Sequence, residues 1–432
     1  MPNHDIPTRD KPEETVLDID FVRSQFPGLA HGWTFFDNAG GSQILKRAVE
    51  RINTFLYDKN VQIGGSYAVS QAAAAALYEA RTSAMHLVNA SRPEEIVFGS
   101  STTALLQNLA RAMTSQLTGG DEIVVTIADH ESNIGPWDRL RDAGIIIKFW
   151  PLNRDTFALD LADLEPLMSD RTKLVCITHV SNILGSINPV REIADFVHER
   201  GARICVDAVA YAPHRAVDVQ GLDVDYYVFS LYKTYGPHYA LMYGKYEHLL
   251  ELDTLYHYFY GKDKVPGKLE PGNPNYELAY STCGIVDYLC ELGEKAGETG
   301  SIRDKIVAAY GAIATQENAL VDRLLGYLRG RNDCRIIGQS SNRDGNRIPT
   351  ISFVFDGRDS AEICKAMDAH RIAIRFGDFH SRRLAEYLDL TENNGMVRVS
   401  MVHYNTVEEI DRMTIALDNI LGSTGRTVTT AA

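Results

Sequence analysis

The sequence is poor in cysteine, and its cysteines lack the spacing of a metal site or a disulfide framework. Only six occur among 432 residues, none in a C-x-x-C pair. Three lie in apolar or periodic runs, where a cysteine usually packs as a small hydrophobe. These three are Cys176, Cys205 and Cys364; the others are Cys283, Cys290 and Cys334. We therefore expect no zinc site, no disulfide scaffold and no metal, and a reducing cytoplasm fits this pattern.

Long apolar runs and basic clusters are missing as well. No uninterrupted apolar stretch reaches the ~20 residues of a membrane-spanning helix, and the polar first residues have no signal-peptide core. The 43 basic and 57 acidic residues give a net charge of −14 without a sustained basic run. Nucleic acid and membrane are therefore not expected as partners, whereas a small anionic ligand in a locally positive pocket is compatible with this charge.

What the sequence does contain is a regular alternation of β-rich and helical segments. Seven segments are predicted to be strands: 95–98, 122–126, 145–150, 174–178, 203–207, 226–230 and 240–244. Helical periodicity between them is typical of a mostly parallel sheet in an α/β fold. Ligands of such folds bind at the carboxyl ends of the strands.

The remaining segments suggest two domains. Residues 19–295 are expected to form a large domain, and 296–422 a smaller α/β domain that opens with a long helix and includes a strand over 372–376. Residues 1–18 are charged and interpreted as a loose leader, and 423–432 as a tail. The glycine- and proline-bearing stretch 256–280 is predicted to be a long loop.

Residues with reactive side chains lie at or just after the ends of predicted strands. They are Thr102, Thr103, His130, Asn182, Asp207 and Lys233. Lys233 ends a β-rich run among aromatic residues, where desolvation favours the free amine that a Schiff base requires; a solvated surface lysine is the alternative. Asp207 ends an apolar strand, where a carboxylate needs a cationic partner such as a pyridinium nitrogen, unless it is an ordinary helix cap.

Two further segments point to a phosphate and a planar ring. Ser100-Ser101-Thr102-Thr103 lies between a strand and a helix, where hydroxyls and free N–H groups bind anions. His130, in Asp-His-Glu-Ser-Asn, can stack on a ring, although a hydrogen-bonded structural histidine is the commoner case.

These motifs occur in a fixed order: Thr-Thr, His with Asn-Ile-x-Pro-Trp, His-x-Ser-Asn-x-x-Gly, Val-Asp-Ala, and Ser-x-x-Lys-x-Tyr-Gly-Pro. The order resembles the class V aminotransferases, and most closely their cysteine desulfurase and selenocysteine lyase branch, from Phe36 to Ser400. The resemblance implies a pyridoxal 5'-phosphate (PLP) enzyme of fold type I that acts on an amino acid. It also implies a large domain with a mostly parallel seven-stranded sheet, a smaller α/β C-terminal domain and a homodimer.

The resemblance also implies roles for matching residues. Lys233 would form the Schiff base, Asp207 would pair with the pyridine nitrogen, and His130 would stack on the ring, so these three are the catalytic candidates. Asn182 would lie beside the cofactor hydroxyl and the substrate. The phosphate would be held by Thr102, Thr103, Ser230 and the hydroxyl of Tyr232, with Asn273 reaching it from the partner subunit.

The resemblance also implies which residues would contact the substrate. Arg398 matches the arginine that clamps the substrate α-carboxylate, a bidentate task suited to a guanidinium. Further candidate substrate contacts are Asn38, Ala39, Arg375 and His380.

Three departures from the desulfurase pattern affect the predicted reaction. His380 stands where desulfurases carry the cysteine that accepts sulfur, Ala210 replaces a glutamine that contacts the cofactor phenolate, and Tyr232 replaces a histidine. A persulfide route is therefore not expected. Carbon–sulfur bond cleavage or a related β-elimination is favoured.

Several alternatives remain open. They are loss of a β-carboxylate or sulfinate with capture of an alanine enamine by an aldehyde, transamination, and epimerisation. A Ser-x-x-Lys acyl-transfer enzyme with Ser230 as nucleophile is disfavoured because that motif opens a helix, whereas Ser230 ends a strand.

Overall fold

The computed structural model describes residues 17–422, so residues 1–16 of the expected leader and the whole expected tail over 423–432 lie outside the described residues. The main sheet has seven strands in the order β2-β8-β7-β6-β5-β3-β4. Their bounds are β2 Ile96–Gly99, β3 Glu122–Thr126, β4 Ile146–Trp150, β5 Thr172–Thr178, β6 Arg203–Asp207, β7 Tyr226–Ser230 and β8 Ala240–Gly244. All pairs are parallel except those of β8, which runs antiparallel to β2 and β7. The predicted fold class is confirmed.

The inner strands of this sheet are buried on both faces. Along β3, Val124 belongs to one hydrophobic cluster, whereas its neighbours Ile123 and Val125 belong to another. The same alternation in β5, β6 and β7 separates two cores, as expected when helices cover both sides of a parallel sheet. The helices of this part are α2 Lys46–Asp58, α3 Ala68–Val88, α4 Thr102–Met113, α5 Gly135–Asp138, α6 Leu161–Leu164, α7 Val190–His198, α8 Val219–Leu222, α9 Tyr246–Glu251 and α10 Tyr276–Lys295.

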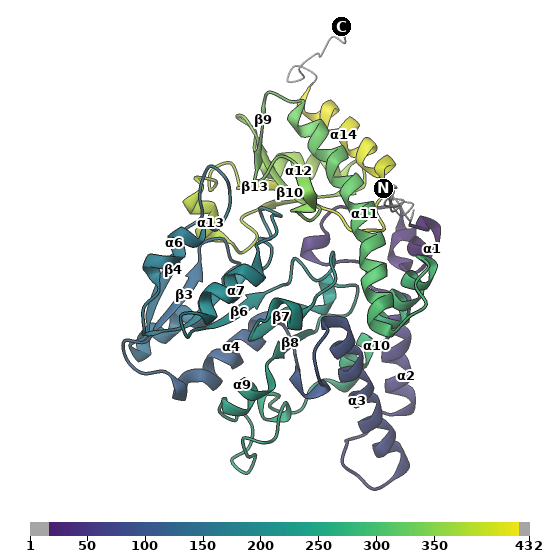
Figure 1. Cartoon of the computed structure of the whole chain (residues 1–432). Coiled ribbons are helices and arrows are strands. Elements are labelled where there is room, and N and C mark those ends of the chain that lie inside the picture. Colours follow the sequence, from purple (N-terminus) through teal and green to yellow (C-terminus); the bar gives the residue numbers. More distant parts are fainter. Residues whose placement is uncertain (1–16, 423–432) are drawn as a thin grey trace, which may run out of the picture.

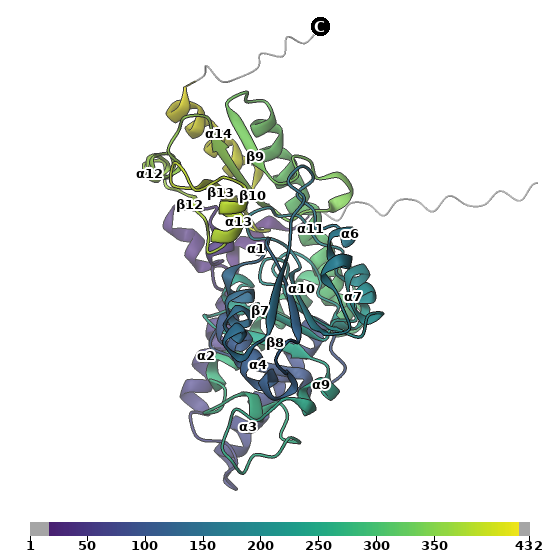
Figure 2. The ribbon, with the colours of Figure 1, turned by 90° about the vertical axis from the view of Figure 1, so that its left-hand side faces the viewer.

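A second sheet lies above the main one in both views (Figures 1 and 2). It is antiparallel, in the order β12-β13-β10-β9, and helices pack on it around a third hydrophobic cluster. Its elements are β9 Cys334–Ile337, β10 Thr350–Phe355, β12 Arg375–Gly377, β13 Met396–Ser400, α12 Ser360–Asp368, α13 Arg382–Tyr387 and α14 Val407–Leu421.

Two features connect this upper part to the lower one. The 28-residue helix α11 Ile302–Arg329 packs on α10 at one end and on α14 and β9 at the other. Near the N-terminus, after α1 Ile19–Ser24, the short strand β1 Thr34–Phe35 pairs in parallel with β11 Ile372–Ala373. The predicted boundary between residues 295 and 296 falls in the link between α10 and α11; as a domain boundary it stays a prediction.

Two sequence-based expectations need correction. The loop predicted over 256–280 ends at Asn275, whose side chain accepts a hydrogen bond from the Leu278 N–H and so caps α10. The predicted strand over 372–376 is interrupted at Ile374 and divided between β11 and β12, which belong to different sheets. No helix among residues 17–422 is long and apolar enough to cross a membrane.

Candidate active site

A cavity of about 700 Å³ opens at the carboxyl edge of the main sheet. Its volume lies within the range of small-molecule and cofactor sites. Nine of the predicted site residues line it: Thr102, Thr103, His130, Asn182, Asp207, Ser230, Tyr232, Lys233 and His380. They meet because β2, β3, β5, β6 and β7 run in the same direction and end at this edge.

One end of the cavity is rich in hydroxyl groups. Helix α4 begins there with Ser101 as its cap, whose side chain accepts from the Ala104 N–H. The hydroxyl of Thr102 lies 2.7 Å from that of Ser230, and the hydroxyl of Thr103 lies 2.8 Å from that of Ser132. Hydroxyl donors and the positive end of a 12-residue helix suit a phosphate group.

A carboxylate lies elsewhere on the cavity wall. Asp207 is only 4% exposed, and its Oδ1 accepts a hydrogen bond from the Val209 N–H at 2.9 Å. Burial raises the pKa of Asp207 to about 6, although the Val209 N–H and the positive charge of Lys233 oppose this effect. A cationic group in the cavity would relieve that cost.

His130 is held as a neutral ring. Burial, together with the positive charges of Lys233, His380 and Arg398, lowers its pKa to about 3. Its Nδ1 accepts from the Ser132 N–H at 3.0 Å, so the ring hydrogen is on Nε2. The turn that carries His130 is fixed by buried Asp129, which accepts from Asn133 Nδ2 at 2.7 Å and from the Thr178 N–H at 3.1 Å.

Lys233 lines the same cavity and is the last residue of the short turn that follows β7. Burial and the positive charges of Arg398 and Arg375 lower its pKa to about 8, although Asp207 and Asp37 act in the opposite direction. A lysine with this pKa is about one-tenth free amine at pH 7, far more than an ordinary lysine, and the free amine is the form that acts as a nucleophile.

The substrate-side arginine is buried close to this lysine. Arg398 on β13 is 3% exposed; its Nη2 lies 3.1 Å from Oδ1 of Asp37, and its Nη1 donates to the Asn182 carbonyl at 3.2 Å. Its Nε has no hydrogen-bond partner among the described residues. Arg375 is paired with Arg398 across β12 and β13 and lies 3.5 Å from Oδ2 of Asp37. Asp37 thus lies between two arginines.

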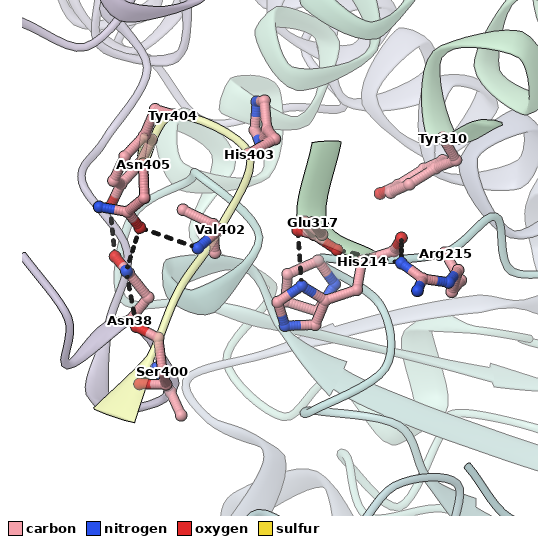
Figure 3. Close-up of polar contacts among 12 residues, drawn as sticks. Asn38, His214, Arg215, Tyr310, Glu317, Ser400, Val402, His403, Tyr404 and Asn405 are labelled. Atoms are coloured by element: carbon pink, nitrogen blue, oxygen red, sulfur yellow. Dashed lines mark hydrogen bonds and ion pairs between the residues drawn. The ribbon is translucent and has the colours of Figure 1, made fainter. Parts of the chain in front are cut away.

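Five predicted residues do not line the cavity: Arg375 and Arg398, and also Asn38, Ala39 and Asn273. The amide nitrogen of buried Asn38 donates to the carbonyls of Phe35 and Ser400, each at 2.9 Å, and to Asn405 (Figure 3). The Ala39 N–H donates to the Ser400 hydroxyl at 2.8 Å. In this way Asn38 and Ala39 fix the segment that carries Asp37. Asn273 lies in the loop before α10, with its Oδ1 3.4 Å from the Tyr256 hydroxyl, and its contact with a partner subunit stays a prediction.

Some contributors were missed from the sequence. Asp37 and Phe379 contact Arg398, the latter with its ring centroid 3.9 Å from the guanidinium carbon. Ser132 fixes the tautomer of His130. A serine two residues after a histidine is a local hydrogen-bonding signal that sequence reading can use. No sequence signal links Asp37 to Arg398, because 361 residues separate them.

The comparisons with known proteins agree with this site. The profile of the family described as Aminotransferase class-V matches residues 34–413, so the chain belongs to the class-V aminotransferase family. This family and its desulfurase-like members define a PLP-dependent enzyme of fold type I, as the resemblance implied.

Individual relatives match along nearly the whole chain. Aminotransferase-like protein FGM3 of Gibberella zeae is 42% identical over 413 residues, which cover 93% of this chain and 98% of that protein. Cysteine desulfurase-like protein ustD of Aspergillus flavus is 36% identical over 421 residues, covering 95% of this chain and 92% of that protein. The apo cysteine desulfurase of Thermococcus onnurineus NA1 superposes with a TM-score of 0.82 at 26% identity, covering 94% of this chain and 98% of that one.

Proposed function

We propose that this enzyme cleaves a bond at the β-carbon of an amino acid, and that the reaction is carbon–sulfur cleavage by β-elimination without a persulfide. One observation carries the proposal. Lys233, whose pKa is lowered by burial and by nearby Arg398, lines the cavity, yet no cysteine does. Four of the six cysteines are buried elsewhere, and Cys290 and Cys334 also lie outside the cavity wall.

The donor set in the cavity fits PLP. Hydroxyls at the start of α4 suit its phosphate, and the buried carboxylate of Asp207, with its raised pKa, suits the protonated pyridine nitrogen. Asn182 has one amide hydrogen engaged by the Phe379 carbonyl at 3.0 Å, which leaves the second for the phenolate. Bound PLP supplies an electron sink for carbanion chemistry.

The chain's own residues then divide the work. The Arg398 guanidinium, with its unpartnered Nε, binds the α-carboxylate and orients the substrate. The free amine of Lys233 takes the α-proton, which its pKa of about 8 allows near neutral pH. His130 is neutral and keeps its hydrogen on Nε2, so it supplies a ring face and no proton acceptor. The active unit is proposed to be a homodimer in which Asn273 of one subunit completes the phosphate site of the other.

One observation favours a second candidate, the loss of a β-carboxylate or sulfinate followed by carbon–carbon bond formation with an aldehyde. Arg375 is a second cation beside Arg398, and its side chain is 55% exposed. It is positioned to attract a second acidic group on the substrate, which this alternative requires and β-elimination does not.

The test combines spectroscopy with product analysis. Enzyme reconstituted with PLP is expected to show an absorption band near the visible edge that borohydride shifts. The Lys233→Ala variant should lose this band, whereas Lys365→Ala, an exposed lysine on α12, should keep it. Incubation with S-alkyl cysteines, cysteine sulfinate and aspartate then identifies the reaction from thiol, pyruvate, alanine and carbon dioxide. Thiol and pyruvate in equal amounts would support β-elimination. Carbon dioxide or alanine without thiol would contradict it and support the second candidate, the loss of a β-carboxylate or sulfinate.

A further inference from the structure

The segment at the position of the desulfurase sulfur acceptor is attached to the main-sheet part by a set of hydrogen bonds. The His380 carbonyl accepts from the Glu131 N–H at 2.9 Å. Asn182 donates from Nδ2 to the Phe379 carbonyl at 3.0 Å, and its Oδ1 accepts from the Ser381 hydroxyl at 2.8 Å. Three contacts from two different loops therefore hold residues 379–381 as part of the cavity wall.

The backbone of this segment has an unusual conformation. Phe379 and His380 are consecutive left-handed residues, with φ of 53° and 59°. Neither residue has the conformational freedom of glycine, so the surrounding contacts must enforce the conformation, and such enforced positions concentrate at functional sites. The Phe379 ring is buried under the Arg398 guanidinium, and the next side chain, His380, is directed to the cavity.

Most of the acid–base groups on the cavity wall are paired or assigned to the cofactor. The Tyr232 hydroxyl is expected at the phosphate, and Asp142 is an exposed carboxylate. His130 is neutral with its Nδ1 occupied, and Asp207 is expected to pair with the pyridine nitrogen. Glu131 and Asp138 form ion pairs with Arg383 at 3.0 and 3.3 Å. Lys233 takes the α-proton. The remaining imidazole, His380, has its ring centroid 5.5 Å from that of His130, and its ring nitrogens form no hydrogen bond within residues 17–422.

We propose that His380 is a catalytic residue that donates a proton to the sulfur leaving group on the β-carbon of the substrate. This role rests on the proposed β-elimination. Lys233 removes the proton from the α-carbon, the electron pair of the C–H bond forms the α,β double bond, and the C–S bond breaks with its pair on sulfur. Sulfur takes the His380 proton and leaves as a neutral thiol. His380 is exposed at the cavity mouth and regains a proton from water.

The decisive experiment compares two leaving groups in the His380→Asn variant. Asparagine tolerates the left-handed conformation, so the wall is expected to survive. With S-ethyl-L-cysteine, whose alkyl thiol needs a proton to leave, kcat/KM should fall about 100-fold. With S-(4-nitrophenyl)-L-cysteine, whose thiolate is stable, it should fall by less than about 5-fold.

Further readouts separate this role from a structural one. The cofactor absorption band, the affinity for PLP and the exchange of the α-hydrogen with D2O should remain, because they depend on other residues. His370→Asn is the control, because His370 is an exposed histidine outside the cavity. This variant should leave kcat/KM unchanged with both substrates. Equal losses with both substrates, or no loss with either, would overturn the role of His380. Absence of thiol from both substrates with the wild-type enzyme would instead overturn the proposed function, and this role with it.

Discussion

The guanidinium of Arg398 and the carboxylate of Asp37 form an ion pair, with Nη2 and Oδ1 3.1 Å apart, that joins β13 to the segment after β1. The Arg398 side chain is 3% exposed and that of Asp37 is 27% exposed. Burial lowers the pKa of Arg398 to about 10, and Asp37 opposes this shift. The N-terminal segment thus orients a residue near the other end of the chain.

Replacing Asp37 by asparagine should therefore weaken substrate binding. Without its anionic partner, the Arg398 guanidinium is no longer held in one orientation, and that orientation must be restored when the α-carboxylate binds. We expect KM for the amino acid to rise about tenfold, equivalent to about 1.4 kcal/mol, with a smaller change in kcat. Steady-state kinetics of the reconstituted Asp37→Asn enzyme measure both.

Asp411→Asn provides the control for this prediction. Asp411 pairs with Arg323 at 2.6 Å on the surface, where an ion pair contributes little. Its kinetic constants should match those of the wild type. A lower KM in Asp37→Asn would mean that Asp37 competes with the substrate for Arg398 rather than orienting it.

The reactivity of Lys233 should depend on pH in a way that distinguishes it from surface lysines. Because its pKa is lowered to about 8, its free-amine fraction reaches one half at about pH 8 and levels off above about pH 9, whereas an ordinary lysine reaches one half only at about pH 10.5. Competitive acetylation of the cofactor-free protein, followed by mass spectrometry, measures this profile. Arg398→Gln removes a positive charge and should move the midpoint to higher pH. A midpoint near 10 in the wild type would contradict the prediction.

The strand pattern of the main sheet was readable from the sequence because each strand is a short apolar run bounded by turn residues. β3, β6, β7 and β8 begin and end at the predicted residues. Helix α10 was not predicted, because Ser281, Thr282 and Gly284 interrupt its apolar pattern. These small residues serve close packing: a Cβ on Gly284 would lie 2.6 Å from the backbone of Arg47 on α2.

Some residues of the candidate site could likewise be predicted from the sequence, and others could not. Lys233, Asp207 and His130 were predicted because each follows a strand end, and the topology of a parallel sheet brings such ends together. Contacts of residues that do not follow a strand end of the main sheet depend on tertiary packing, which a local pattern does not encode. Phe379 under Arg398 and Asp37 beside it are such contacts. For the same reason Asn38 matched a motif although its amide is engaged within the protein.

A buried charge cluster between α11 and the segment after β6 should contribute strongly to stability. Glu317 is fully buried and accepts from His214 Nδ1 at 2.9 Å and from Arg215 Nη1 at 3.0 Å (Figure 3). Glu317→Gln leaves the Arg215 guanidinium without its anion, so we expect the free energy of unfolding to fall by about 3 kcal/mol. Denaturant unfolding measures it. Glu386→Gln, from the exposed pair with Arg382, is the control and should change stability by less than about 1 kcal/mol.

Asp207 should make the cofactor-free protein less stable than it would be with an isosteric amide. Its pKa is raised to about 6, so between pH 3.8 and 6 the folded chain holds more protons on this carboxyl than the unfolded chain does. Stability therefore falls as the pH rises through that window, and the penalty is complete above about pH 6. Asp207→Asn removes the ionisation. It should stabilise the cofactor-free protein by up to about 3 kcal/mol at pH 8 and by about half as much at pH 5.

A buried aspartate whose pKa is shifted in the opposite direction provides the matched control. Asp225 is also almost fully buried, yet His198, the Ile204 N–H and Lys245 outweigh burial and lower its pKa. Asp225→Asn should therefore destabilise the cofactor-free protein at pH 8, where Asp207→Asn stabilises it. Thermal unfolding of both variants at pH 5 and pH 8 measures the two signs. A gain for Asp207→Asn that does not depend on pH would mean that packing, and not the buried charge, sets the stability of this site.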